Sequence, residues 1–149
     1  MEDKRILDRA IDIATEAHYG QTDLAGRPYI LHPLHVMAQM DSDNSRAVAV
    51  LHDVMEDGGH DVESLLRLQI PPLIVDAVHL LTRARDDEGS EDYAAYIRRV
   101  SRDMMARKVK IADLAHNMDV TRLPELGSRD LERLGRYHAA WALLKGPRR

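Results

Sequence analysis

Residues 47–57 read Ala47-Val48-Ala49-Val50-Leu51-His52-Asp53-Val54-Met55-Glu56-Asp57, an apolar run that passes directly into a histidine and three acids. Residues four apart share a helix face, so one helix over this stretch would place His52 near Glu56 and Asp53 near Asp57. Burying unpaired charge is costly, so such a cluster persists where a cation or a hydrogen-bond network compensates it. The alternative is an amphipathic helix whose polar face carries these residues, and the His-Asp pair alone does not separate the two interpretations.

Apolar residues outside this stretch also recur every three or four positions, which is the helical period. Helices are expected over residues 6–17, 33–40, 47–55, 61–68, 72–81, 90–100, 105–118 and 128–144, with Asp61, Ser90 and Ser128 as N-caps. In the last helix the residues expected on the buried side are Leu131, Leu134, Tyr137, Trp141 and Leu144. No convincing strand alternation or internal repeat appears. The pattern predicts an all-α fold, with seven to nine helices in one compact domain over residues 1–149.

The composition is that of an ordinary globular domain and excludes several classes of function. Among 149 residues, 44% are apolar and 31% charged, and no apolar run approaches the roughly 20 residues that a membrane span needs. No signal peptide precedes the first helix, and the absence of cysteine removes disulfides and thiol nucleophiles, so a cytoplasmic location is expected. A net charge of −4 argues against long nucleic acid as a partner, whereas a small phosphorylated ligand needs only a local basic site.

Two further segments supply candidate metal ligands. His32 lies at a helix start marked by Pro33, and Asp113 follows an alanine in an otherwise apolar turn. Together with His52 and Asp53 they would form a set of two imidazoles and two carboxylates. Such a set suits an octahedral ion such as Mn²⁺ or Fe²⁺, with Co²⁺ and Mg²⁺ as further candidates. Two coordination positions would remain for water and a phosphate oxygen, as metal-assisted hydrolysis requires.

Four groups of motifs, in the right order, resemble the hydrolase domain of the bifunctional Rel/Spo alarmone enzymes, which belongs to the HD superfamily of metal-dependent phosphohydrolases. They are Ala17-His18-Tyr19-Gly20-Gln21 with Gly26-Arg27-Pro28-Tyr29-Ile30-Leu31-His32-Pro33-Leu34, then residues 49–57, then Leu81-Thr82-Arg83 with Tyr93-Ala94-Ala95-Tyr96-Ile97, and finally Val109-Lys110-Ile111-Ala112-Asp113 through Asn117-Met118. The match covers nearly the whole chain and leaves no length for a synthetase domain. The chain therefore resembles the stand-alone small alarmone hydrolases, which implies an HD-type helical domain.

The resemblance also implies roles for individual residues. It puts His32, His52, Asp53 and Asp113 at the metal-ligand positions, usually of Mn²⁺, Glu56 and Asp57 at the pair that positions and activates water, and Asn117 near the substrate's sugar. The implied reaction is hydrolytic removal of the 3′-pyrophosphate from guanosine tetraphosphate or pentaphosphate. His18 and His116 accompany the motifs and are expected to have positioning or structural roles.

Asp23 and Leu24 depart from the family pattern. They stand where the alarmone enzymes usually carry adjacent Arg and Lys, which contact the purine and the phosphates, and neither residue can make such contacts. This departure favours an alternative, an HD phosphatase or pyrophosphatase acting on another nucleotide or a phosphorylated cofactor. A third hypothesis is a non-catalytic nucleotide-binding sensor, but such sensors are expected to lose a metal ligand or the acid pair, and here none is missing.

Other candidates for substrate binding are basic or aromatic. Lys110 precedes Asp113 by three residues, while Arg133 and Tyr137 share a helix face at four-residue spacing; Arg83 and Arg85 lie in a charged loop. A small phosphorylated nucleotide is thus the expected partner, with no role for a membrane, and a homo-oligomer is compatible with the sequence.

Overall fold

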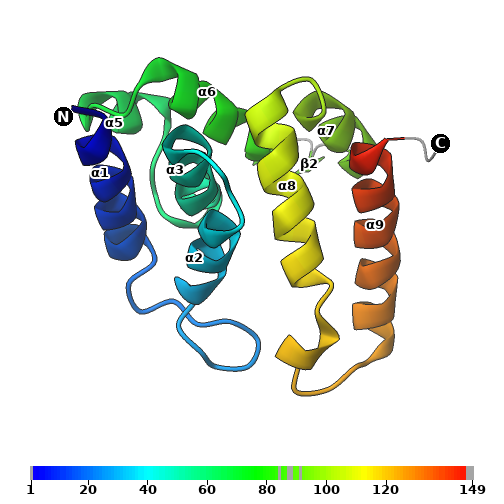
Figure 1. The fold of residues 1–149 in the computed structure, drawn as a ribbon. Coiled ribbons are helices and arrows are strands. Elements are labelled where there is room, and N and C mark those ends of the chain that lie inside the picture. Colours follow the sequence, from blue (N-terminus) through cyan, green and yellow to red (C-terminus); the bar gives the residue numbers. More distant parts are fainter. Residues whose placement is uncertain (1, 84, 87–88, 91, 147–149) are drawn as a thin grey trace.

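The computed structural model, which describes residues 2–83, 85–86, 89–90 and 92–146, is built almost entirely of helices (Figure 1). In chain order these are α1 (Glu2–Ala17), α2 (Leu31–Ala38), α3 (Asp43–Leu51), α4 (Val54–Asp57), α5 (Val62–Arg67), α6 (Pro72–Leu81), α7 (Tyr93–Val100), α8 (Met104–Asn117), the short 3₁₀ helix η1 (Val120–Arg122) and α9 (Ser128–Lys145). The predicted all-α fold is confirmed.

The core centres on α3, which packs against α1, α2, α6 and α8. Residues 47–51, five successive apolar residues on all sides of this helix, are completely buried. A helix that is apolar all round requires neighbours on every side, which explains its central place. Ser42 caps its start, because the hydroxyl oxygen accepts the backbone N–H of Ser45 at 3.1 Å.

The single helix predicted over residues 47–55 is interrupted. Helix α3 ends at Leu51 and α4 begins at Val54, while Asp53, between them, has φ −109° and ψ 0°, outside the helical region. The Ala49 carbonyl accepts from the His52 backbone N–H at 3.3 Å and faces His52 Nδ1 at 2.6 Å. These i−3 contacts compete with the i−4 bond that would continue the helix. The junction places His52 and Asp53 at a bend, where the expected stacking of His52 on Glu56 does not apply.

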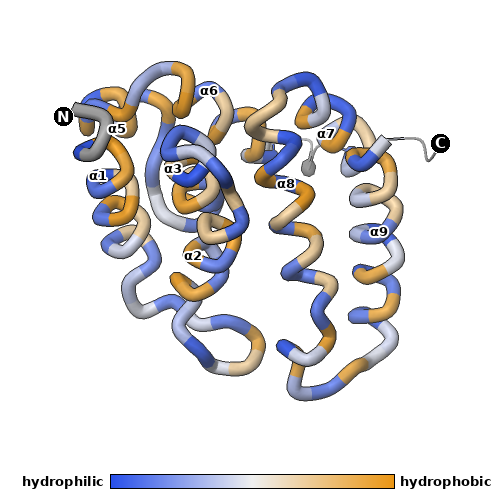
Figure 2. Tube along the Cα trace, in the orientation of Figure 1, coloured by the Kyte–Doolittle hydropathy of each residue, from blue (hydrophilic) through white to orange (hydrophobic). Residues whose placement is uncertain are grey.

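Helices α8 and α9 form an antiparallel pair joined through η1, and α7 also packs against both (Figure 1). Figure 2 shows hydrophobic and hydrophilic segments alternating along α9. Of its expected core residues, Leu144 is buried and three are partly buried, but Leu131 is 56% exposed, so that prediction was wrong. Because α9 lies at the outer side of the fold, its neighbours cover a narrower stripe than the apolar pattern suggested.

Two helix starts also differ from the sequence prediction. Gly127 is the N-cap of α9, and the Asp130 carboxylate accepts its backbone N–H at 2.8 Å, whereas Ser128 is the first helical residue. Helix α7 begins at Tyr93 after Asp92 rather than after Ser90. Ser90 instead belongs to β2 (Gly89–Ser90), which pairs antiparallel with β1 (Arg85–Asp86), an unexpected hairpin too short to change the fold class. No helix in the described part of the chain is long and apolar enough to cross a membrane.

Candidate functional site

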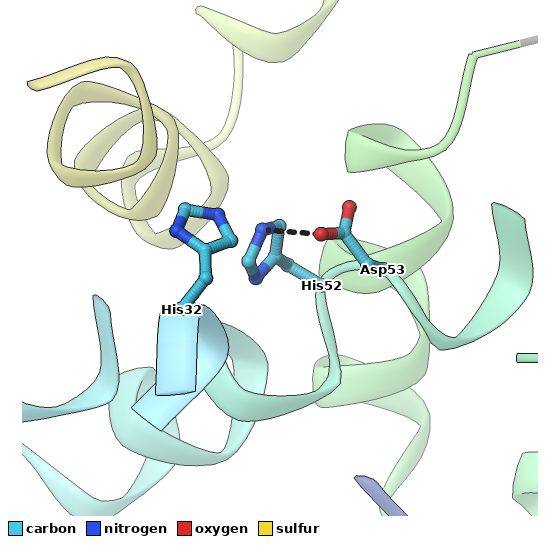
Figure 3. Close-up of side chains that lie close together, drawn as sticks. All are labelled: His32, His52 and Asp53. Atoms are coloured by element: carbon cyan, nitrogen blue, oxygen red, sulfur yellow. Dashed lines mark ion pairs between the residues drawn. The ribbon is translucent and has the colours of Figure 1, made fainter. Parts of the chain in front are cut away.

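A cluster of imidazoles and carboxylates forms where α2, the α3–α4 junction and α8 meet. His32 comes from α2, and His52 and Asp53 come from the junction, as Figure 3 shows. The Nε2 atom of His32 lies 2.8 Å from Oδ1 of Asp113, and Nε2 of His52 lies 3.1 Å from Oδ2 of Asp53 and 3.4 Å from Oδ1 of Asp113. The structure therefore brings together the four residues that the sequence suggested as metal ligands.

The protonation state of His52 bears on what this cluster can bind. Its Nδ1 lies 2.6 Å from the Ala49 carbonyl oxygen and must carry a proton there, while its buried Nε2 makes no hydrogen bond to a described residue. In a neutral ring the Nε2 lone pair would face the carboxylates of Asp53 and Asp113. Burial lowers the pKa of His52, but these carboxylates outweigh burial and raise it well above its ordinary range. The site thus favours a positive charge at Nε2, which a proton or a metal ion can supply.

His116 contacts the nitrogen of His32 that points away from Asp113. The Nδ1 atoms of the two rings lie 2.7 Å apart, and the His116 ring stacks on His35 with centroids 3.8 Å apart. Burial, together with the nearby Arg122, lowers the pKa of His116 to about 4, so His116 is neutral at pH 7. A neutral His116 can accept a hydrogen bond from His32 Nδ1–H, and with a cation in the cluster the His32 Nε2 lone pair would then be available to it. The expected positioning role of His116 has a structural basis.

Asp113 is held by two side chains from its own helix besides the histidines. Lys110 Nζ lies 2.8 Å from Asp113 Oδ2, and Asn117 Nδ2 donates to Oδ1 at 3.0 Å. Burial raises the pKa of Asp113, but Lys110 and His52 together bring it well below its ordinary value. Asp113 is therefore an ionised carboxylate in a fixed orientation. Lys110 and Asn117, expected to contact substrate, are both engaged with it.

Tyr29 is a site residue that the sequence analysis did not single out. Its hydroxyl donates a hydrogen bond to Asp53 Oδ2, and burial and the Asp53 charge both raise its pKa, so the proton stays on Tyr29. Burial raises the pKa of Asp53, but His52 outweighs burial and brings it to about 2. The position of Tyr29, one turn before His32 in the same motif, is the signal that could have identified it.

Glu56 and Asp57 stand beside this cluster. Oxygens of Asp53, Glu56 and Asp57 lie within 4.8 Å of one another. Glu56 Oε1 accepts the backbone N–H of Arg83 at 2.7 Å, and burial raises the pKa of Glu56. Asp57 is exposed, and its backbone carbonyl accepts from Gln21 Nε2 at 2.7 Å. A carboxylate with a raised pKa close to a cation site is suited to accept a proton from water.

The cluster opens onto the first of two adjoining cavities. The inner cavity, of about 480 Å³, has acidic and basic residues on its wall, namely Asp53, Glu56, Asp57, Asp113, Arg83, Lys110 and Arg136. The outer cavity, of about 370 Å³, is lined by Thr22, Asp23, Leu24, Asp119, Arg122, Leu123 and Arg133. Tyr29, Asn117 and Tyr137 line both cavities, so the two are parts of one cleft.

The remaining sequence candidates divide between these cavities. Arg83 lines the inner cavity and Tyr137 lines both, whereas Arg133 lines the outer one and is paired with Asp130. The Arg85 side chain lies outside the part of the chain that the structure describes. Arg136, which lines the inner cavity, was missed, although it lies one position before Tyr137.

The loop that departs from the family pattern faces the outer cavity. Asp23 Oδ1 accepts the backbone N–H groups of Ala25 and Arg27, each at 2.9 Å, and these bonds lower the pKa of Asp23. The Asp23 carboxylate thus stabilises its own turn, while Leu24 is 70% exposed at the cavity wall.

Several curated proteins are similar in sequence to this chain. The guanosine-3′,5′-bis(diphosphate) 3′-pyrophosphohydrolase of Haemophilus influenzae is 36% identical over 116 residues, which are 71% of this chain and 17% of the relative. The bifunctional (p)ppGpp synthase/hydrolase SpoT of Escherichia coli is 34% identical over 123 residues, or 75% of this chain and 17% of the relative. The GTP pyrophosphokinase of Streptomyces coelicolor is 32% identical over 126 residues, or 79% and 15%.

A solved structure shares the fold. It is described as a metazoan ortholog of SpoT that hydrolyzes ppGpp, and it superposes with a TM-score of 0.73 at 19% identity, covering 95% of this chain and 86% of that one. The chain is an HD domain of the Rel/Spo type. This HD domain spans less than one fifth of the length of the curated relatives named above. It matches no family model.

Proposed function

We propose that this HD domain is a metal-dependent phosphohydrolase that removes the 3′-pyrophosphate from a guanosine tetraphosphate or pentaphosphate. The observation that carries the proposal is the buried Nε2 of His52, which makes no hydrogen bond to a described residue but lies 3.1 and 3.4 Å from two carboxylates. These groups stand beside the Glu56–Asp57 pair on the wall of a partly basic cavity. The activities named for the relatives from Haemophilus influenzae and Escherichia coli support the same reaction.

His32, His52, Asp53 and Asp113 would hold the metal ion. Their donor set, two imidazole nitrogens and carboxylate oxygens, is compatible with Mn²⁺ first and with Fe²⁺, Co²⁺ or Mg²⁺ as alternatives. When bound, such an ion lowers the pKa of water and offsets phosphate charge. His116 keeps the His32 Nε2 lone pair free for the ion, and Tyr29 and Lys110 hold the two carboxylates in place.

The acid pair would handle the proton of the attacking water. Glu56, with its pKa raised by burial, accepts that proton while Asp57 orients the water. The water oxygen forms a bond to the phosphorus attached to the 3′ oxygen, and the bond from phosphorus to the 3′ oxygen breaks. The 3′ oxygen takes up one proton, equivalent to the one that Glu56 accepted, and leaves as a hydroxyl. The products are inorganic pyrophosphate and guanosine 5′-diphosphate or 5′-triphosphate.

The two parts of the cleft suggest how the substrate lies. The inner cavity, with Arg83, Lys110 and Arg136 on its wall, suits phosphates, whereas Leu24, Leu123 and Tyr137 give the outer cavity surfaces for a nucleoside. The partner is then a small phosphorylated nucleotide, and a cytoplasmic homo-oligomer stays compatible with this function.

A second candidate substrate is another nucleotide or a phosphorylated cofactor. It is favoured by one observation: Asp23 and Leu24 line the outer cavity where the alarmone enzymes have basic residues. The Asp23 carboxylate, moreover, accepts hydrogen bonds from the backbone of its own turn. The same hydrolytic machinery would serve either substrate.

Product analysis separates these candidates. Purified protein loaded with Mn²⁺ is incubated with a panel of nucleotides that includes guanosine tetraphosphate, and the products are identified chromatographically. Formation of guanosine diphosphate and pyrophosphate supports the first proposal. Turnover of a different nucleotide supports the second. If the protein binds a nucleotide of the panel but hydrolyses none, the result supports a non-catalytic nucleotide sensor.

A further inference from the structure

Tyr93 and Arg136, on the wall of the inner cavity, carry hydrogen-bond donors that are available to a ligand. The hydroxyl of Tyr93 is buried and has no hydrogen-bond partner. Arg136 lines the same cavity and makes no hydrogen bond or ion pair with the described residues. A buried polar group without a partner is destabilising, so an acceptor from a ligand would relieve a cost that the Tyr93 hydroxyl already carries. Arg136 is exposed, so its guanidinium is accessible to the same ligand.

Other basic residues of the cleft are already engaged, which sets Arg136 apart. Lys110 is paired with Asp113 at 2.8 Å, and Arg133 is paired with Asp130. The Arg122 guanidinium donates to the backbone carbonyl of His116 at 3.0 Å and to the side-chain oxygen of Asn117 at 3.2 Å. A phosphate reaching the inner cavity would therefore find in Arg136 a guanidinium whose donors are not in use.

Tyr93 and Arg136 lie on the α7–α9 side of the cavity. The Tyr93 and Tyr137 ring centroids are 6.5 Å apart, and Tyr137 follows Arg136 directly on α9. Arg136 is exposed and also lines a neighbouring, mainly apolar cavity with Tyr93, so it stands at the rim of the inner one. Burial raises the pKa of Tyr93, so its hydroxyl stays a donor at neutral pH. Both groups thus offer donors from the same side, and neither is part of the imidazole–carboxylate cluster.

We propose that Tyr93 and Arg136 form a subsite for the outer phosphate of a diphosphate group whose inner phosphate lies at the imidazole–carboxylate cluster. The inference rests on the proposed function. It adds that Tyr93 and Arg136 make the cleft select a diphosphate in preference to a monophosphate. A guanidinium can bind two phosphate oxygens in its plane, and the tyrosine hydroxyl donates to one more. The cavity volume of about 480 Å³ is within the range of small-ligand sites.

Titration calorimetry with inorganic pyrophosphate and inorganic phosphate tests this subsite without turnover. Free Mn²⁺ is kept constant in every titration, because pyrophosphate chelates divalent ions. The wild-type protein should bind pyrophosphate more tightly than phosphate. Arg136→Gln should weaken pyrophosphate binding about tenfold, as expected for one charge-assisted hydrogen bond, and leave phosphate binding unchanged. Arg129→Gln, which removes an exposed arginine of the same helix, is the matched control and should change neither affinity.

Tyr93→Phe tests the hydroxyl separately. It keeps the ring and removes a donor that has no partner in the free protein, so the melting temperature should stay the same or rise. The affinity for pyrophosphate should nevertheless fall several-fold, about the effect of one hydrogen bond to a charged group, with phosphate affinity unchanged. A purely structural hydroxyl would instead lower the melting temperature and leave the ratio of the two affinities unaltered.

Two results of the titrations would overturn the subsite. One is an equal loss of phosphate and pyrophosphate affinity in Arg136→Gln, which would show a general effect of charge. The other is an unchanged preference for pyrophosphate in both variants. Failure of the proposed function is a different outcome, namely selective pyrophosphate binding through Arg136 without hydrolysis of any nucleotide 3′-diphosphate. Hydrolysis with an unchanged KM in Arg136→Gln would keep the function and exclude the subsite.

Discussion

The Nδ1 atoms of His32 and His116 lie 2.7 Å apart, so one ring must donate and the other accept. His116 is neutral at pH 7, so its Nδ1 can accept from a protonated His32 Nδ1, and with an ion in the cluster the His32 lone pair would then be on Nε2, which faces Asp113. A residue 84 positions away thus determines which nitrogen of a proposed metal ligand is available.

Replacing His116 should weaken metal binding without removing a ligand. His116→Ala leaves His32 free to change tautomer or rotate, and loss of such a supporting hydrogen bond typically costs about 10–100-fold in metal affinity. Competition with a chelator of known Mn²⁺ affinity measures the change. His138→Ala, at an exposed histidine of α9, should have no effect, and equal affinities in the two variants would exclude this role.

His116 should also make folding stability depend on pH. Its pKa in the folded protein, about 4, is below the ordinary value of 6.5, so below pH 6.5 the unfolded chain takes up a proton that the folded chain does not. Because of His116, the free energy of unfolding should therefore decrease as the pH falls from 6.5 towards 4. Urea unfolding of metal-free wild type and His116→Gln at several pH values should show a flatter profile for the variant across this window. Parallel profiles would contradict the lowered pKa.

Asp113→Asn should abolish metal binding and activity together. The amide keeps the shape but loses the charge that faces His32 and His52, and it leaves buried Lys110 without its anion. Metal content by mass spectrometry and folding by circular dichroism are measured on the same sample. Asp76→Asn, at an exposed acid of α6, should behave as wild type. A folded Asp113→Asn protein with full metal occupancy would exclude Asp113 as a ligand.

Glu56→Gln should separate proton transfer from metal binding. Losing a general base typically slows the reaction about 10²–10⁴-fold, whereas metal content should stay near that of wild type. The pKa of Glu56 lies above its ordinary value, so wild-type kcat/KM should decrease as the pH falls through that raised pKa. The variant should lack this decrease. Loss of the ion in Glu56→Gln would instead make Glu56 a ligand.

Leu24→Arg tests whether the outer cavity binds the nucleotide. Leu24 is exposed on the cavity wall, so an arginine there could reach phosphate or purine without disturbing the turn that Asp23 stabilises. The KM for guanosine tetraphosphate should fall about tenfold, with less effect on kcat, because the contact forms in ground and transition states alike. Efficient wild-type hydrolysis together with an unchanged KM in Leu24→Arg would show that this loop does not contact the substrate.

The helical architecture and the set of chemical groups could be predicted from the sequence alone. Helix formation depends on local periodicity, so the apolar spacing predicted the all-α fold. The residue types in the motifs likewise indicated an imidazole–carboxylate set. These inferences need no knowledge of how the helices pack.

Contacts between distant elements were decided by the tertiary structure. The break at His52, the bond from Tyr29 to Asp53 and the pairing of His32 with His116 depend on how separate elements pack, which local periodicity does not encode. On α9, Arg133, Arg136 and Tyr137 share nearly one helix face, yet Arg133 lines the outer cavity and Arg136 the inner one. Helix geometry fixes the angle between these side chains but not their surroundings. The packing of α9 against α7 and α8 decides which cavity each side chain lines.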